Sequence, residues 1–153
     1  GFLRSYNEAI VAVGSNDLRE AKTSRLMSLG IPLATVIHPT AVISPFSHIS
    51  RGCAVLARAV VNPNAHVGTG CIVNTGAIIE HDCIIGDFAN ICPGVSMAGH
   101  TKIGRKSFLG IGSTIMDDIT VGEESVVGAG AVVIRNVPDR VVVAGVPAKE
   151  IHS

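Results

Sequence analysis

A histidine and an aspartate stand side by side at positions 81 and 82, and together they could perform general acid–base chemistry. The imidazole of histidine titrates near neutral pH, so it can take up a proton and release it again. A carboxylate bonded to one ring nitrogen would fix the tautomer and stabilise the protonated ring. Neighbouring residues on a flat strand point to opposite faces, so Asp82 can reach His81 only if the chain turns at this point.

The segment from position 37 to 138 repeats every six residues in one register, and each of its seventeen units begins with an aliphatic residue. Four places later each unit has a small or aliphatic residue. A period of six does not fit the 3.6-residue period of an α-helix. A short fixed repeat predicts a solenoid, in which each unit buries its apolar face only by stacking on its neighbours.

Three units would form one triangular coil, so the repeat predicts five to six coils with residues eighteen apart stacked about 4.8 Å from each other. This register places His81 and Asp82 at the third and fourth positions of their unit, on an outward corner. The sequence therefore predicts that both side chains point away from the core at one turn.

The four cysteines could suggest a metal site or a disulfide, but the register argues against both. Cys53, Cys71 and Cys83 occupy the small inward position, where a thiol behaves as a small hydrophobic group. The sequence contains no Cys-x-x-Cys pair. We interpret these three as buried, reduced, structural thiols, and the role of Cys92 remains open.

The two ends of the chain do not share the repeat. Residues 1–36 read as strand, helix and strand: a buried run at 9–13, a helix from about 15 to 29 and an extended segment at 33–37. We expect this unit to be the rear portion of a larger α/β domain, and the first residue, which is not Met, agrees with that expectation. Residues 139–153 are expected to cap the open edge of the solenoid, with one strand at 141–144.

Composition excludes several functions. The chain has 12 Lys and Arg against 12 Asp and Glu, so nothing favours nucleic acid or an anionic membrane as a partner. No apolar run approaches the roughly 20 residues that span a bilayer, and no signal peptide is evident. We therefore expect a cytoplasmic protein.

The repeat pattern of aliphatic, Gly, x, x, small, x, followed by Gly-Val-Pro-Ala-Lys-Glu-Ile at 145–151, resembles the hexapeptide-repeat acyltransferases over about residues 33–151. The resemblance implies an all-β fold, a left-handed parallel β-helix. It also implies a homotrimer with acetyl-CoA bound in the groove between neighbouring helices. The amino-terminal α/β unit would be a remnant of a sugar-nucleotide-binding domain.

A narrower resemblance rests on Val36-Ile-His-Pro-Thr-Ala41, Asn74-Thr-Gly-Ala77, Glu80-His-Asp-Cys83 and Gly110-Ile-Gly-Ser113. These motifs are similar to the branch that contains sialic acid O-acetyltransferases and bacterial N-acetyltransferases of UDP-4-amino sugars. In that branch an amino-terminal α/β domain holds the sugar nucleotide, and residues 8–36 match its rear part. The implied activity is acetyl transfer from acetyl-CoA to an amine or hydroxyl of a sugar or nucleotide sugar in bacterial surface-glycan biosynthesis.

The resemblance also implies roles for single residues. His81 matches the catalytic base and Asp82 its acidic neighbour. Asn90 falls where a characterised amino-sugar enzyme has a histidine near the acetyl group, and backbone groups of Gly99, Ile111 and Ala129 fall where the family contacts the coenzyme. Basic side chains that could meet the phosphates of coenzyme A are Lys102, Arg105, Lys106, Arg135 and Lys149.

Two other hypotheses belong to different classes. One is a non-catalytic trimeric β-helix that serves as a binding or structural module. The other is a metalloenzyme, because the β-helix carbonic anhydrases of the gamma class bind zinc through three histidines. The histidine spacing here does not match that class, so we expect no metal. We interpret His38, His48, His66 and His152 as surface residues, whereas His100 is either a pocket residue or an exposed corner.

Overall fold

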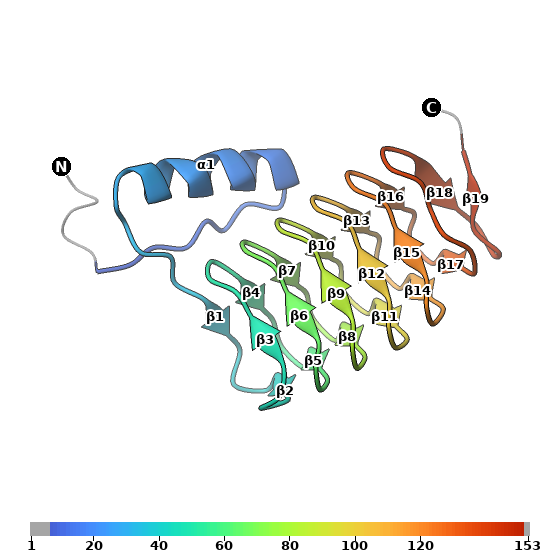
Figure 1. Ribbon diagram of the computed structural model, residues 1–153, viewed down its shortest axis with the longest axis horizontal. Coiled ribbons are helices and arrows are strands. Elements are labelled where there is room, and N and C mark those ends of the chain that lie inside the picture. Colours follow the sequence, from blue (N-terminus) through green and yellow to red (C-terminus); the bar gives the residue numbers. More distant parts are fainter. Residues whose placement is uncertain (1–6, 152–153) are drawn as a thin grey trace.

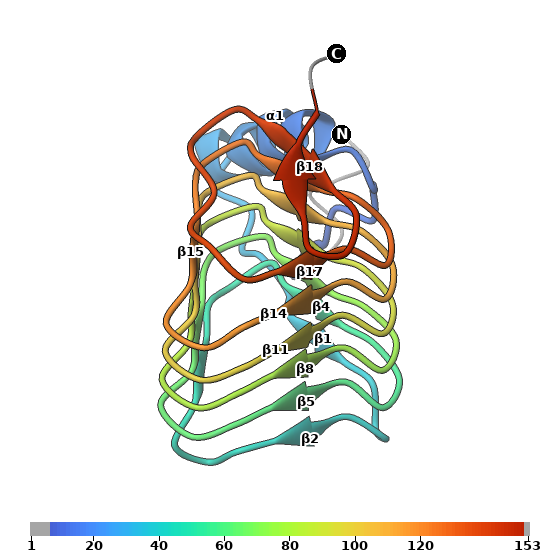
Figure 2. The same ribbon diagram turned by 90° about the vertical axis from the view of Figure 1, so that its right-hand side faces the viewer.

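The computed structural model describes residues 7–151, and most of this chain winds into a parallel β-helix with one α-helix lying along it (Figure 1). From β1 to β15 each coil consists of three two-residue strands joined by tight corners, and successive coils stack on one another (Figure 2). His152 lies outside the described residues. No described helix is long and apolar enough to cross a membrane.

The strands form three sheets, one on each side of the solenoid. The eight-stranded sheet contains β1 (Val36–Ile37), β4 (Ala54–Val55), β7 (Ile72–Val73), β10 (Asn90–Ile91), β13 (Phe108–Leu109), β16 (Val126–Val127), β18 (Val142–Ala144) and β19 (Lys149–Glu150). The six-stranded sheet contains β2 (Val42–Ile43), β5 (Val60–Val61), β8 (Ile78–Ile79), β11 (Ser96–Met97), β14 (Thr114–Ile115) and β17 (Val132–Val133). The five-stranded sheet contains β3 (His48–Ile49), β6 (His66–Val67), β9 (Ile84–Ile85), β12 (Lys102–Ile103) and β15 (Thr120–Val121).

The predicted register of eighteen residues is confirmed. From β1 to β17, each strand pairs in parallel with the strand one coil away, so His48 lies opposite His66 and Ile79 lies opposite Met97. The predicted carboxy-terminal strand is β18, which continues the eight-stranded sheet in parallel. It is then covered by β19, which pairs with it in the antiparallel direction.

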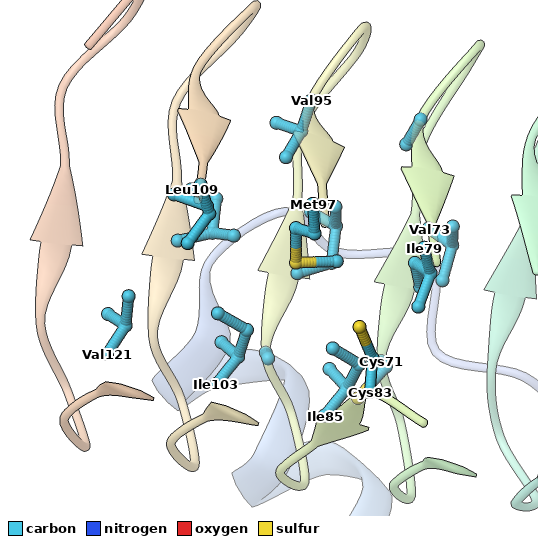
Figure 3. Close-up of a cluster of buried hydrophobic side chains, with 14 of the residues drawn as sticks. Cys71, Val73, Ile79, Cys83, Ile85, Val95, Met97, Ile103, Leu109 and Val121 are labelled. Atoms are coloured by element: carbon cyan, nitrogen blue, oxygen red, sulfur yellow. The ribbon is translucent and has the colours of Figure 1, made fainter. Parts of the chain in front are cut away.

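The core is a single column of aliphatic side chains inside the coils. The second residue of each strand from β4 to β18 points inward, and Ile79, Met97 and Leu109 are at most 1% exposed (Figure 3). The exception is the first coil, where Ile37 is 44% exposed. Burial of the inward residue is incomplete there because none of the described residues forms a further coil on that open edge.

The cysteine interpretation is confirmed: Cys53, Cys71 and Cys83 are free and buried. Their thiols donate to backbone carbonyl oxygens of the next coil, for example Cys83 Sγ to the Ala98 oxygen at 3.2 Å. Burial raises the pKa of the Cys83 thiol, so it stays protonated and unreactive at neutral pH. Cys92 is free and only partly buried.

The corners of the solenoid form three columns. The histidine corner, between the six- and five-stranded sheets, carries 63–64, 81–82, 99–100 and 117–118. The glycine corner, between the eight- and six-stranded sheets, carries 75–76, 93–94, 111–112 and 129–130. The helix corner, between the five- and eight-stranded sheets, carries 69–70, 87–88, 105–106 and 123–124.

The helix α1 (Asn16–Ser28) begins where the sequence predicts, with Ser15 as its N-cap. The Ser15 side chain accepts from the Leu18 amide at 3.4 Å. The expected flanking strands are reduced to one parallel bridge between Ala9 and Leu33. Two-strand pairing is marginal without further neighbours, and no other described strand pairs with this bridge.

Arg19 attaches α1 to the solenoid, although it is a charged residue only 1% exposed. Its guanidinium donates to the carbonyl oxygens of Gly70 and Phe88, both at 2.7 Å, on the helix corner. It also donates to the Val13 and Gly14 carbonyl oxygens, at 3.0 and 3.1 Å. A planar group with five N–H donors suits a site made of several carbonyls, because each donor finds its own acceptor.

Ion pairs reinforce this attachment at the next coils. Lys106 lies 2.6 Å from Asp17 and 3.3 Å from Glu124, while Arg105 pairs with Glu20. The hydrogen bond from Lys106 lowers the pKa of the Asp17 carboxyl group. Because these groups are partly solvated, we assign most of the attachment energy to Arg19 rather than to the ion pairs.

Replacing Arg19 by Met should release α1 while leaving the β-helix folded. The buried carbonyls would lose their donors, at a cost of about 2–5 kcal/mol. Hydrogen exchange followed by mass spectrometry should show faster exchange in residues 7–33 and unchanged protection in β8 to β16. Arg25→Met, at an exposed position of the same helix, is the matched control. Equal protection of α1 in both variants would contradict the role of Arg19.

Candidate active site

His81 and Asp82 form a hydrogen-bonded pair on the histidine corner, between β8 and β9. The distance from His81 Nδ1 to Asp82 Oδ2 is 2.8 Å. Asp82 adopts a left-handed backbone with φ of 59°, which turns its side chain to the same side as the histidine. The turn that the sequence requires is therefore present, and the side chains of His81 and Asp82 are 52% and 38% exposed.

The hydrogen bond between His81 and Asp82 determines which ring nitrogen of His81 carries the proton. Hydrogen bonds from His81 and then Asn64 lower the pKa of the Asp82 carboxyl group, so it is ionised at neutral pH. An ionised carboxylate can only accept, so His81 Nδ1 must donate to it. In the neutral ring, Nε2 then keeps its lone pair, which a general base needs.

Gly99 lies directly against the His81 ring, one coil further along the same corner. A Cβ atom at Gly99 would lie 2.6 Å from His81 Cε1 and 2.8 Å from His81 Nε2. The backbone at Gly99 is not left-handed, so the absence of a side chain is needed for space and not for conformation. The family resemblance singled out Gly99 because its backbone would contact the coenzyme. The structure shows that Gly99 also leaves the space that the His81 ring occupies.

His100 is the other histidine at this corner. It is exposed, and its ring meets the His81 ring edge to face with centroids 5.3 Å apart. Ligand atoms of His81, Asp82 and His100 lie within 4.8 Å of one another, so within residues 7–151 these side chains could hold a metal ion. An ion there would compete with the bond between His81 Nδ1 and Asp82. That no metal takes part stays a prediction.

Asn64 also belongs to the site, and the sequence analysis missed it. Its Nδ2 donates to Asp82 Oδ1 at 3.1 Å from one coil earlier on the histidine corner. The spacing of eighteen residues between Asn64 and Asp82 is the signal that could have revealed this contact.

The other proposed site residues lie elsewhere on the chain. Ile111 and Ala129 are exposed on the glycine corner, on a different edge from His81. Asn90 is buried in β10 of the eight-stranded sheet, where its Nδ2 donates to the Gly14 carbonyl oxygen at 3.2 Å. Lys149 is exposed in β19. His38, His48 and His66 are exposed, as predicted.

The glycine corner exposes the backbone of several glycines. At Gly76, Gly112 and Gly130 an added Cβ atom would meet nothing within 4 Å, so these glycines face open space. Their φ values of 65–67° do not by themselves require glycine, because the histidine corner carries Asn64, Asp82 and His100 at φ of 59°. Because these glycines have no side chain, a long flexible ligand such as the pantetheine arm of coenzyme A could approach their backbone closely.

A hollow of about 540 Å³ beside the start of α1 is a less suitable phosphate site. It is lined by Gly14 to Asp17 and by Lys106, Phe108, Glu124 and Val126. Lys106 is already balanced there by Asp17 and Glu124. Two of the five basic candidates, Arg105 and Lys106, thus hold α1 in place, and Lys102, Arg135 and Lys149 remain candidates for phosphate contact.

Comparisons with known proteins give the family. The family profile described as bacterial transferase hexapeptide (six repeats) matches residues 100–135. A variant of perosamine N-acetyltransferase from Caulobacter crescentus, in which one histidine is replaced by asparagine, was solved in complex with CoA and GDP-perosamine. It is 36% identical to this chain, with a TM-score of 0.97. That alignment covers 99% of this chain and 73% of the other. The chain belongs to the hexapeptide-repeat acyltransferases.

Two further structures agree with this assignment. The acetyltransferase domain of PglB from Neisseria gonorrhoeae, in complex with acetyl coenzyme A, is 40% identical over 98% of this chain and 75% of the other, with a TM-score of 0.95. WeeI from Acinetobacter baumannii is 28% identical over 93% of this chain and 69% of the other, with a TM-score of 0.90. No match was found among curated protein sequences. The solenoid is thus the left-handed β-helix of the hexapeptide-repeat acyltransferases, as the sequence resemblance implied.

Substituting Gly99 in this acyltransferase should displace His81 without unfolding the chain. In Gly99→Ala the new methyl group would overlap the half-exposed His81 ring, which can rotate away, so the free energy of unfolding should change by less than about 1 kcal/mol. Displacing a reacting group by about 1 Å costs roughly 100-fold in rate, and we expect a loss of that size in kcat. Asp117→Ala, one coil further on the same corner, is the control. Full activity in Gly99→Ala would contradict the role of Gly99 in positioning His81.

Proposed function

We propose that this acyltransferase moves the acetyl group of acetyl-CoA to the amino group of a nucleotide-linked amino sugar, with His81 as the general base. The observation that carries the proposal is the His81–Asp82 pair, whose geometry leaves Nε2 free at an exposed corner. The acceptor class is supported by the relatives, since one was solved with CoA and GDP-perosamine and another with acetyl coenzyme A. We place the reaction in the cytoplasm, as part of surface-glycan biosynthesis.

In the proposed reaction, His81 Nε2 takes the proton of the acceptor amine as its nitrogen attacks the acetyl carbon. Asp82 stabilises the imidazolium that results, because its carboxylate already accepts from Nδ1. The C–S bond of the thioester then breaks, and the departing CoA thiolate takes up the proton held on His81. Gly99 keeps the ring in place throughout.

We further propose that the site is formed between protomers of a homotrimer. The six-stranded sheet lies between the histidine corner and the glycine corner, and its outward positions are largely apolar, with Val42 63% and Ile78 36% exposed. If three such sheets face a threefold axis, the histidine corner of one protomer meets the glycine corner of the next. His81 would then act opposite the neighbour's Ile111 and Ala129, where the coenzyme would lie.

The role of His81 can be tested by replacing it with Gln. Loss of a general base typically lowers the rate by about 10²- to 10⁴-fold, and we expect that loss in kcat for His81→Gln. Release of the CoA thiol would be followed with nucleotide-linked 4-amino sugars, sialic acid and free amino sugars as acceptors. His48→Gln, an exposed histidine on β3, should behave as wild type. Undiminished turnover in His81→Gln would rule out the assignment, and no binding of acetyl-CoA by calorimetry would favour a non-catalytic module.

The shared site can be tested by mixing two inactive variants. His81→Gln removes the base, and Ala129→Trp fills the exposed glycine corner, so neither should be active alone. In a trimer that contains both variants, one of the three interfaces combines two intact corners, so about a third of the wild-type activity should return. Differently tagged chains, co-expressed and purified through both tags, provide the sample. If both corners of one site came from a single chain, mixing would restore nothing.

A further inference from the structure

Asn64 stands one coil before Asp82 on the histidine corner, and neither the fold nor the proposed chemistry above requires a particular side chain there. Both residues have φ of 59°, so their corners superpose along the column. The Asp82 amide donates to the Pro63 carbonyl oxygen at 3.1 Å, which fixes the two corners in register. Asn64 itself is exposed, so packing does not select it.

The amide of Asn64 completes the contacts of the Asp82 carboxylate. Asp82 Oδ1 accepts from Asn64 Nδ2 at 3.1 Å, and Asp82 Oδ2 accepts from His81 Nδ1 at 2.8 Å. Because each oxygen is held by a different partner, the carboxylate cannot rotate about its terminal bond without breaking a hydrogen bond. An exposed carboxylate with one partner would lack this restraint, because terminal torsions of this kind are broad.

The direction of the Asn64 bond also matters. A neutral N–H donor favours the ionised carboxylate without competing for the His81 proton. A carboxylate in the place of Asn64 would put a like charge beside Asp82, and a purely apolar residue would leave one oxygen to water. Asparagine is also one of the few residues with a side chain that adopts the left-handed backbone readily.

We propose that Asn64 is a positioning residue that acts through Asp82 to hold His81 in the tautomer with Nδ1 protonated and Nε2 free. The chain Asn64–Asp82–His81 thus draws on two successive coils, and Gly99 supports the ring from a third. The effect of Asn64 on catalysis rests on the proposed function, whereas its effect on the His81 tautomer does not. The experiment that tests the role of Asn64 must therefore include a measurement that does not depend on enzymatic turnover.

The test compares Asn64→Gly with Arg140→Gly. Both replace an exposed residue in the left-handed conformation by glycine, with φ of 59° and 57°, but Arg140 is far from the pair, on the helix corner side. Nitrogen-15 NMR of histidine-labelled protein reports the tautomer of each ring, and the His81 signals are assigned by their loss in His81→Gln. We expect wild type and Arg140→Gly to show protonated Nδ1, and Asn64→Gly to show a mixture of tautomers.

Kinetics supply the second readout. In Asn64→Gly we expect kcat to fall about tenfold, the loss of one modest hydrogen bond, with the KM for acetyl-CoA unchanged. Asn64→Asp, which keeps the shape but repels Asp82, should lose more than Asn64→Gly. If His81 keeps the wild-type tautomer in Asn64→Gly, or if kcat stays at the level of Arg140→Gly, the inference is overturned. If wild type turns over no acceptor, the proposed function fails, and the tautomer comparison alone still decides whether Asn64 positions the pair.

Discussion

The parallel hydrogen bonding between residues eighteen apart is the constraint on which the rest of this structure depends. Each strand from β1 to β17 has only two residues, too few to be stable alone, and it is held by the strands of the neighbouring coils. The same bonds fix the corners, because the corner amides also donate to carbonyls one coil away, as Asp82 does to Pro63. A side chain at a corner therefore has neighbours at fixed positions above and below it.

The histidine corner uses this regularity for chemistry. A flexible loop would have to order His81, Asp82, Asn64 and Gly99 separately, and would lose conformational entropy at each. Here the backbone of all four is already set by the stacking, so only side-chain torsions remain to be restrained. The Asn64 and Gly99 contacts restrain them from two sides, and the pair is prepared for proton transfer without burial. The amino-terminal helix is attached on the helix corner through Arg19, so it leaves the histidine corner open.

The sequence predicted the scaffold well because periodicity is a property of the chain itself. The six-residue period predicts the register, the inward cysteines and the outward turn at His81 and Asp82. The comparison with solved structures supplied the family and supports the acceptor class. The repeat period did not reveal the role of Arg19, because its buried guanidinium depends on the carbonyls of Gly70 and Phe88, which are 51 and 69 residues away in the chain. Nor did it show that Arg105 and Lys106 pair with α1, because charge alone does not identify its partner.

The contacts between Asn64, His81, Asp82 and Gly99 come from three consecutive coils, and this has a consequence for how such a chain can vary in length. Deleting or adding one whole coil at the far end of the solenoid leaves these neighbours next to each other. The same change between 64 and 99 preserves every strand pairing yet brings different residues together at the corner. The middle of the solenoid is therefore fixed in length by the contacts of its active-site side chains.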